Sequence, residues 1–148
     1  NKPGRLTEAE WDVMKGHCRI GSEMLIREPP IGVDRACGNP LLALASEVAL
    51  CHHERWDGTG YPRGLRGEEI PLSARITSVV DVLDALCHAR PYKHAIPFET
   101  SVNEVLSLSG THFDPDVIAL LSRRLPSLRE VLGRDAVRSP SDGARLAG

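Results

Sequence analysis

Four residues of this chain have side chains that could carry out metal chemistry: His17, His52, His53 and Asp81. Imidazole and carboxylate groups together suit divalent transition metals such as iron, manganese or zinc. Two such ions a few ångström apart can activate water and hold a phosphoryl group. The residue types therefore predict a metal-dependent hydrolytic site, for which a phosphodiester is the favoured substrate.

Helical periodicity predicts that two of the histidines point to the interior. His17 recurs with apolar residues at spacings of three and four, and so does His52 near the end of the next expected helix. The two stripes are Val13, His17, Ile20 and Met24, and Leu41, Ala45, Val48 and His52. Because helix neighbours diverge by about 100°, we expect His52 and His53 to reach two different metal ions, or opposite sides of one centre.

The third expected helix has an apolar face and a polar face. The residues predicted to face the core are Ile76, Val79, Val80, Leu83, Leu86 and Cys87, and the opposite stripe is Thr77, Asp81, Asp84 and His88. Arg90 and Lys93 follow this helix and flank Pro91-Tyr92. Two cations and an aromatic ring beside an acidic stripe could seat a phosphate and stack a base.

Each feature also has an ordinary structural explanation. An inward histidine such as His17 is more often a hydrogen-bonded core residue, and a pair such as Asp81 and Asp84 more often belongs to a solvated face. Basic residues at a helix end commonly offset the helix dipole. We interpret Cys18, Cys51, His88 and His112 as packing, surface or helix-start residues. The combination of an inward histidine, an adjacent histidine pair and a long glycine-rich loop favours the metal site.

An all-α fold of about five helices must position these groups. Thr7 and Glu10 form a capping box, Asn39-Pro40 and Asp114-Pro115 are helix starts, and residues 54–71 are a turn-rich loop. The expected helices span about residues 7–27, 39–53, 72–89, 97–108 and 114–125. Residues 1–126 are predicted to form one domain, and residues 127–148, rich in Ser, Arg and Gly, a flexible C-terminal tail.

The amino-acid composition limits the kinds of molecule that this chain is expected to bind and the compartment in which it is expected to work. The 148 residues are 41% hydrophobic and 26% charged, which is typical of a soluble globular protein, and the net charge is −2. Such a charge gives no basic field for duplex DNA or RNA. The four cysteines are scattered and predict reduced thiols in a cytoplasmic protein. No apolar stretch is long enough to cross a membrane.

The segment HHERWDGTGYPRGLRGEEIPLSARI, followed by DVLDAL and RPYK, resembles the HD-GYP domain family. The flanking KPGRLTEAEW, MKGHCRIG and THFDPDV extend the resemblance over roughly residues 2–122. It implies a helical bundle of the HD type, hydrolysis of cyclic di-GMP to pGpG or GMP, and a centre of two or three ions, usually iron or manganese.

The resemblance also implies residue roles. His17, His52, His53 and Asp81 match metal ligands, and we rank Asp81, His52 and His53 as catalytic. Residues that match substrate contacts are Asp84, Arg90 and Lys93, with the loop residues Gly60, Tyr61 and Pro62. The family's loop has also been linked to contacts with cyclase-type partner domains, and a receiver or sensor domain is expected upstream.

One element of the family is absent, because no histidine in this chain is followed by aspartate. That His-Asp dyad and its helix should lie just before Lys2, so we expect a fragment of a longer domain rather than a diverged relative. The fragment alone is predicted to be weakly active or inactive, with apolar surface exposed on its first helix. The competing hypothesis is a non-catalytic module that binds the dinucleotide or docks a partner protein.

Overall fold

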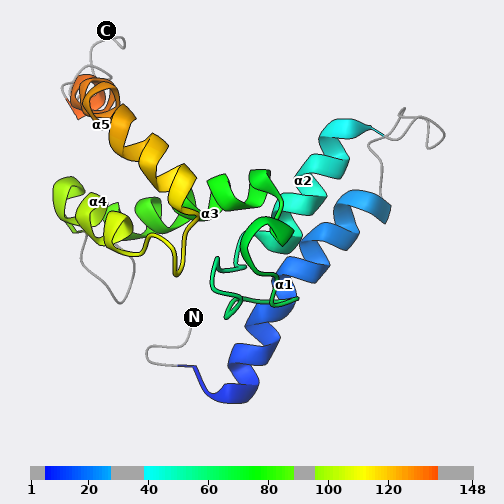
Figure 1. The fold of residues 1–148 in the computed structure, drawn as a ribbon. Coiled ribbons are helices and arrows are strands. Elements are labelled where there is room, and N and C mark those ends of the chain that lie inside the picture. The colour runs from blue at the N-terminus through cyan, green and yellow to red at the C-terminus, as the bar shows by residue number, and fades with distance from the viewer. Residues whose placement is uncertain (1–5, 28–38, 89–95, 137–148) are drawn as a thin grey trace, which may run out of the picture. The chain divides into compact units, whose positions relative to one another are not determined.

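The computed structural model describes residues 6–27, 39–88 and 96–136 and is all-helical in these residues (Figure 1). The helices are α1 (Glu8–Arg27), α2 (Pro40–Cys51), the 3-10 turn η2 (Gly67–Glu69), α3 (Leu72–Cys87), α4 (Phe98–Ser107) and α5 (Pro115–Ala136). The predicted all-α fold class is therefore confirmed.

Most helix starts follow the predicted capping signals. The backbone N–H of Thr7 donates to Glu10 Oε2 at 2.7 Å, and the N–H of Glu10 donates to Thr7 Oγ1 at 3.3 Å, which is the reciprocal capping box. Asn39 caps α2 by accepting from the Leu41 N–H at 2.9 Å, with Pro40 in the first turn. Short polar side chains thus satisfy N–H groups that the helix itself leaves unpaired.

The helices α1 and α2 form an antiparallel pair that carries the histidines. The hydroxyls of Ser22 and Ser46 lie 2.7 Å apart between the two helices, and both residues are buried. A Cβ at Gly21 would lie 3.7 Å from that of Ala49, so the backbones approach closely here. This contact places the middle of α1 beside the end of α2.

The helix α3 packs against both α2 and α4. A buried cluster of Cys51, Ile70 and Ala74 joins α2 to α3, with Leu50 and Leu65 packed on it. The burial of Cys51 confirms its interpretation as a packing residue. A salt bridge between Arg75 Nη1 and Asp114 Oδ2, at 2.7 Å, connects α3 to the residue before α5.

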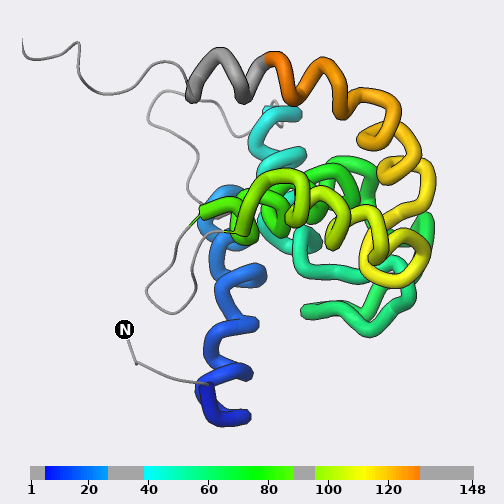
Figure 2. The backbone as a smooth tube through the Cα atoms, turned by 90° about the vertical axis from the view of Figure 1, so that its left-hand side faces the viewer, coloured from blue at the N-terminus to red at the C-terminus, as the bar shows by residue number. Residues whose placement is uncertain are grey.

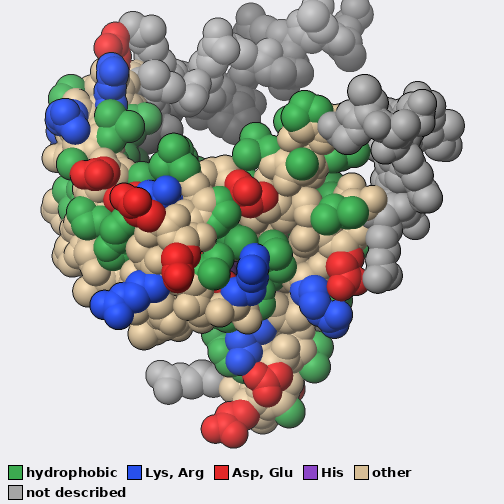
Figure 3. All heavy atoms as spheres, turned by 45° about the vertical axis from the view of Figure 1, so that its right-hand side comes forward, with side chains coloured by type: hydrophobic (Ala, Val, Ile, Leu, Met, Phe, Trp, Pro, Cys, Tyr) green, Lys and Arg blue, Asp and Glu red, His purple; other side chains and the backbone are tan. Residues whose placement is uncertain are grey.

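The predicted buried stripe of α1 was wrong, and the predicted buried face of α3 was right in part. Val13 is 80% exposed, and His17, Ile20 and Met24 are also exposed, because α1 packs through Cys18 and Ser22, one step round the helix. Figures 1 and 2 show the first half of α1 extending past α2 and α3, and Figure 3 shows apolar side chains at the surface of this extension. The expected apolar exposure of the first helix is confirmed.

On α3 the buried residues are Ala74, Ser78, Val79 and Leu86, whereas Ile76 and Val80 are exposed. Val79 and Leu86 were predicted to face the core, whereas the burial of Ala74 and Ser78 was missed because the prediction followed the largest apolar side chains. Asp81 is exposed, as expected for the polar stripe.

Residues 119–148 group apart from residues 1–118 as a second compact unit. Within it α5 continues through Pro126 to Ala136, so the prediction that this helix ends near Leu125 was wrong. Residues 137–148 of the predicted tail lie outside the described residues. No helix among the described residues is long and apolar enough to span a membrane.

Candidate metal centre

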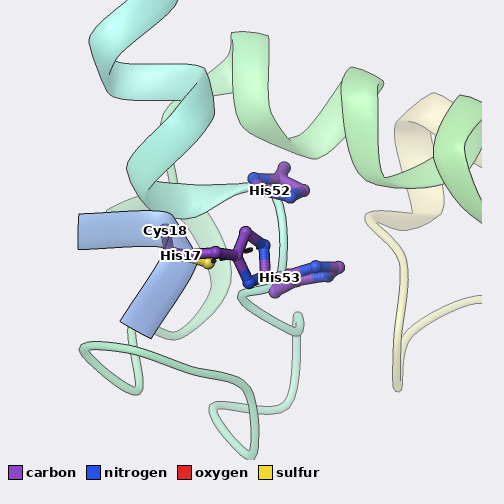
Figure 4. A group of neighbouring side chains, drawn as sticks. All are labelled: His17, Cys18, His52 and His53. Carbon is purple, nitrogen blue, oxygen red and sulfur yellow. Dashed lines mark hydrogen bonds between the residues drawn. The ribbon is translucent and has the colours of Figure 1, made fainter. Parts of the chain in front are cut away.

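Three histidines converge where the middle of α1 meets the end of α2 (Figure 4). His17 comes from α1, His52 is the C-cap of α2, and His53 follows it. The ring centroids of His17 lie 5.5 Å from His52 and 5.1 Å from His53, and those of His52 and His53 are 4.1 Å apart. One potential ligand atom from each of these histidines, and from Cys18, lies within 4.8 Å of the others.

The rings of His17 and His52 are oriented by backbone carbonyls. His17 Nδ1 lies 2.6 Å from the carbonyl oxygen of Met14, and His52 Nδ1 lies 3.0 Å from that of Val48. A carbonyl oxygen only accepts, so each Nδ1 must carry the proton when these bonds form. The Nε2 of each neutral ring then keeps its lone pair, which is the arrangement typical of metal-binding histidines.

The third histidine is held neutral by its surroundings. Burial, followed by the neighbouring His52 and His17, lowers the pKa of His53 to about 4, and the Asp81 carboxylate opposes this shift. At neutral pH the ring is therefore uncharged and able to donate a lone pair to a cation. Asp81 is exposed and lies outside the histidine group, although its charge also acts on Tyr61.

Cys18 also belongs to the histidine group, although the sequence predicted it to be a packing residue. It is completely buried, and its Sγ lies 3.5 Å from His17 Nε2. Burial raises the pKa of the Cys18 thiol, and Glu54 raises it further, so the sulfur remains protonated at neutral pH. A protonated thiol can donate to the imidazole nitrogen, which fits a packing and hydrogen-bonding role.

The loop of residues 54–71, here called the GYP loop, folds around one buried carboxylate. Glu54 is 2% exposed, and its two oxygens accept from the N–H groups of Arg63 at 2.7 Å and Leu65 at 2.9 Å. A Cβ at Gly60 would lie 2.5 Å from the Glu54 Cα, so only glycine fits there. These contacts fold the loop back on itself, so that its middle lies close to Glu54 and the neighbouring His53.

Tyr61 lies at the point where the GYP loop meets the histidine group. Its ring is 4.9 Å from the ring of His53, and its N–H donates to the His53 carbonyl at 3.2 Å. The ring of Trp11, from α1, lies edge-on to the Tyr61 ring at a centroid distance of 6.1 Å. Burial, with the charges of Cys18 and Asp81, raises the pKa of Tyr61 to about 12, so its phenol is neutral.

The other predicted site residues are less closely grouped. Asp84 is exposed on α3 and lies 3.0 Å from His88 Nδ1, at the helix end. Pro62 is exposed next to Tyr61, whereas Gly60 is partly buried. Arg90 and Lys93 lie outside the described residues. His112 was predicted to serve a helix start; its carbonyl accepts from the Trp56 N–H at 3.0 Å, linking its segment to the GYP loop.

Sequence reasoning missed Glu54 and Trp11. Glu54 follows two histidines in a loop of charged residues, and nothing in its type distinguishes a buried carboxylate from an exposed one. Trp11 sits on an amphipathic helix, where an aromatic residue normally indicates core packing. The glycine-rich segment after Glu54 was the available signal, since a tight loop needs an acceptor for its buried N–H groups.

Comparisons with known proteins show the family of this chain. Residues 1–117 match a family model described as HD domain. A cyclic di-GMP phosphodiesterase of Vibrio cholerae is 49% identical over 118 residues, 79% of this chain and 23% of the relative. The cyclic di-GMP phosphodiesterase response regulator RpfG of Xanthomonas campestris is 42% identical over 142 residues, 96% of this chain and 35% of the relative.

A solved structure shares the fold. The crystal structure of a cyclic GMP-AMP specific phosphodiesterase of Vibrio cholerae aligns with a TM-score of 0.58 at 19% identity, over 86% of this chain and 27% of that chain. The chain spans about a quarter to a third of the length of the two relatives. It belongs to the HD domain family, in the HD-GYP group to which its loop motif pointed.

Proposed function

We propose that this chain is part of a metal-dependent phosphodiesterase that hydrolyses cyclic di-GMP, to pGpG or GMP, in cytoplasmic second-messenger signalling. The observation that carries the proposal is the convergence of three imidazoles whose potential ligand atoms lie within 4.8 Å of one another. Relatives at 42% and 49% identity that are named cyclic di-GMP phosphodiesterases support the substrate.

The residues present fit a divalent transition metal. The Nδ1 atoms of His17 and His52 bond to carbonyls, which leaves Nε2 as the atom of each ring available to bind a metal, and His53 is neutral at physiological pH. Asp81 would add a carboxylate beside this group. We assign the metal to His17, His52, His53 and Asp81, with iron or manganese favoured and two or three ions in the complete domain.

A bound divalent ion supplies Lewis acidity that activates water and offsets charge on a phosphoryl group. The chain's own residues then orient the ligands and exclude solvent. Glu54 fixes the GYP loop, and Gly60, Tyr61 and Pro62 form one wall of the site. Asp84, Arg90 and Lys93 would contact the substrate, with the two cations on its phosphates.

The direct test is cleavage of cyclic di-GMP by the natural full-length protein loaded with Mn²⁺ or Fe²⁺, followed by chromatography of the products. We expect the His52→Ala, His53→Ala double variant to lose about 100-fold or more of the rate, because two proposed ligands are removed. His112→Gln is the matched control, since the ring of this histidine stacks on that of Phe113 and lies outside the group. Full activity in the double variant, or faster cleavage of cyclic GMP-AMP, would contradict the proposal.

The competing hypothesis is a non-catalytic module that binds the dinucleotide or docks a partner protein. Binding of cyclic di-GMP that survives complete metal removal, without turnover, would favour that module. We also propose that a receiver or sensor domain regulates the protein and that a cyclase-type domain docks at the exposed Pro62 side of the GYP loop.

A further inference from the structure

The three clustered histidines are held in two different ways. The rings of His17 and His52 are fixed by Nδ1 bonds to backbone carbonyls of their own helices. Among the described residues, no hydrogen bond reaches the ring of His53. An imidazole without such a bond is free to rotate about its side-chain torsions unless packing holds it.

The ring of His53 meets those of His52 and His17 within the cluster, and that of Tyr61 from the GYP loop. The ring of Tyr61 lies 4.9 Å from that of His53 with an interplanar angle of 37°, and the Tyr61 N–H also donates to the His53 carbonyl at 3.2 Å. A contact at this distance is within the range of favourable aromatic pairs. Among the ring contacts of the described residues, Tyr61 is therefore the partner of His53 that comes from outside the cluster.

Tyr61 is itself fixed from two directions. Glu54 anchors the loop that follows it through the N–H groups of Arg63 and Leu65. Trp11 of α1 meets the Tyr61 ring edge-on, at 6.1 Å with an interplanar angle of 74°. Trp11, Tyr61 and His53 thus form a continuous row of rings that runs from α1 through the loop to the histidine group.

We propose that Tyr61 is a positioning residue whose ring holds the His53 imidazole in the orientation required for metal binding, with Trp11 supporting Tyr61 from behind. This inference rests on the proposed metal site and adds a second role to Tyr61 beside the substrate contact that the sequence predicts. The ring carries the effect, and the phenol hydroxyl is dispensable.

The test measures Mn²⁺ affinity of the natural full-length protein by electron paramagnetic resonance and calorimetry, for the wild type, Tyr61→Phe and Tyr61→Leu. We expect Tyr61→Leu to weaken Mn²⁺ binding by about 10- to 100-fold, the range seen when the support of a metal ligand is removed. Tyr61→Phe keeps the ring and should stay within about 3-fold of the wild type. The resonance spectrum of bound Mn²⁺ should change only in the leucine variant.

Trp56→Leu is the matched control for general damage to the loop. Trp56 is also an aromatic of the GYP loop, but its ring contacts Arg75 at 5.8 Å rather than the clustered histidines. We expect it to lower the thermal midpoint of the metal-free protein and to leave Mn²⁺ affinity unchanged. Should Tyr61→Leu not fold, Trp11→Leu offers a milder version, with a loss of about 2- to 10-fold.

Three outcomes would overturn the inference. Wild-type affinity in a folded Tyr61→Leu variant would show that the ring does not position His53. An equal loss in Tyr61→Phe and Tyr61→Leu would assign the effect to the hydroxyl. Equal losses in Tyr61→Leu and Trp56→Leu would reduce it to loop stability. A wild-type protein that binds no Mn²⁺ or Fe²⁺ would instead refute the proposed metal site itself.

Discussion

The helix α1 carries one of the clustered histidines and the GYP loop contacts another, and the two segments differ in how they are held. The helix is regular, yet several of its apolar side chains are exposed, including Val13, Ile20, Met24 and Ile26. The loop has little regular structure, yet it encloses a fully buried carboxylate and is bonded at Arg63, Leu65 and Tyr61. The GYP loop is therefore held in place by specific hydrogen bonds, although it contains little regular secondary structure.

This difference separates two kinds of sequence constraint. A residue on the exposed face of α1 contributes little within the described structure, so its replacement should have a small effect. A residue that closes the GYP loop satisfies backbone groups that water does not reach, and its loss leaves them unpaired. Substitutions in the two regions should therefore differ in how far they lower the free energy of unfolding.

The largest effect on stability is expected for Glu54→Gln. The substitution replaces one acceptor oxygen by an NH₂ group, which faces the N–H of Arg63 or Leu65 without a hydrogen bond. We expect the free energy of unfolding to fall by about 1–3 kcal/mol, the cost of an unsatisfied buried donor. Urea denaturation of the natural full-length protein, followed by circular dichroism, measures it.

Glu69→Gln is the control for that experiment. Glu69 belongs to the same loop, and its Oε2 accepts from the Arg66 N–H at 3.0 Å, but the side chain is exposed. Water can replace this bond, so we expect a change within about 0.5 kcal/mol. Equal losses in both variants would show that burial of Glu54 is not what stabilises the loop.

A smaller effect is expected from pH in the metal-free protein. Burial lowers the pKa of His53 to about 4 and also lowers that of His112, on which Arg55 acts in the same direction. The unfolded chain binds these protons near pH 6.5, before the folded chain does, so stability is full above that pH and is lost as pH falls toward 4. We expect a decrease of about 1–2 kcal/mol between pH 7.5 and pH 5.

The measurement is urea denaturation with a chelator present at several pH values. His112→Gln should reduce the slope, because it removes one of the two groups. A free energy of unfolding that stays constant over this range would mean that neither imidazole is shielded from water in the metal-free protein.

The smallest effect is expected for Val13→Ser on α1. Val13 is 80% exposed, so we expect a change within about 0.5 kcal/mol in the free energy of unfolding of this chain. Val102→Ala is the buried comparison, since Val102 is 1% exposed, and should cost about 1–3 kcal/mol. A loss above about 1 kcal/mol for Val13→Ser would show that its face of α1 is covered in solution.

The sequence predicted the helices better than their faces. Capping at Thr7 and Asn39 is a local interaction, so the starts of α1 and α2 could be read directly. The buried side of α3 depends on what packs against it, and the small residues Ala74 and Ser78 permit a close approach that hydrophobicity does not indicate. Pro126 likewise predicted a helix end, whereas α5 continues through it.

The candidate site was predicted in part. Three of the four proposed ligands, His17, His52 and His53, meet in the structure, while Asp81 acts on His53 through its charge without joining the group. Glu54 and Trp11 could not be predicted, because their roles arise from contacts formed only when the loop closes on α1. Local patterns therefore identified the groups that could bind an ion, but not those that support them.

The hydrogen bonds from His52 to the carbonyls of Val48 and Ala49 connect the site to the final turn of α2. If that turn unfolded, the His52 imidazole would lose both hydrogen bonds. A metal ion bound to the imidazole would therefore stabilise the turn against unfolding. Binding of a metal ion should therefore slow amide hydrogen exchange over the last turn of α2, even before any substrate is added.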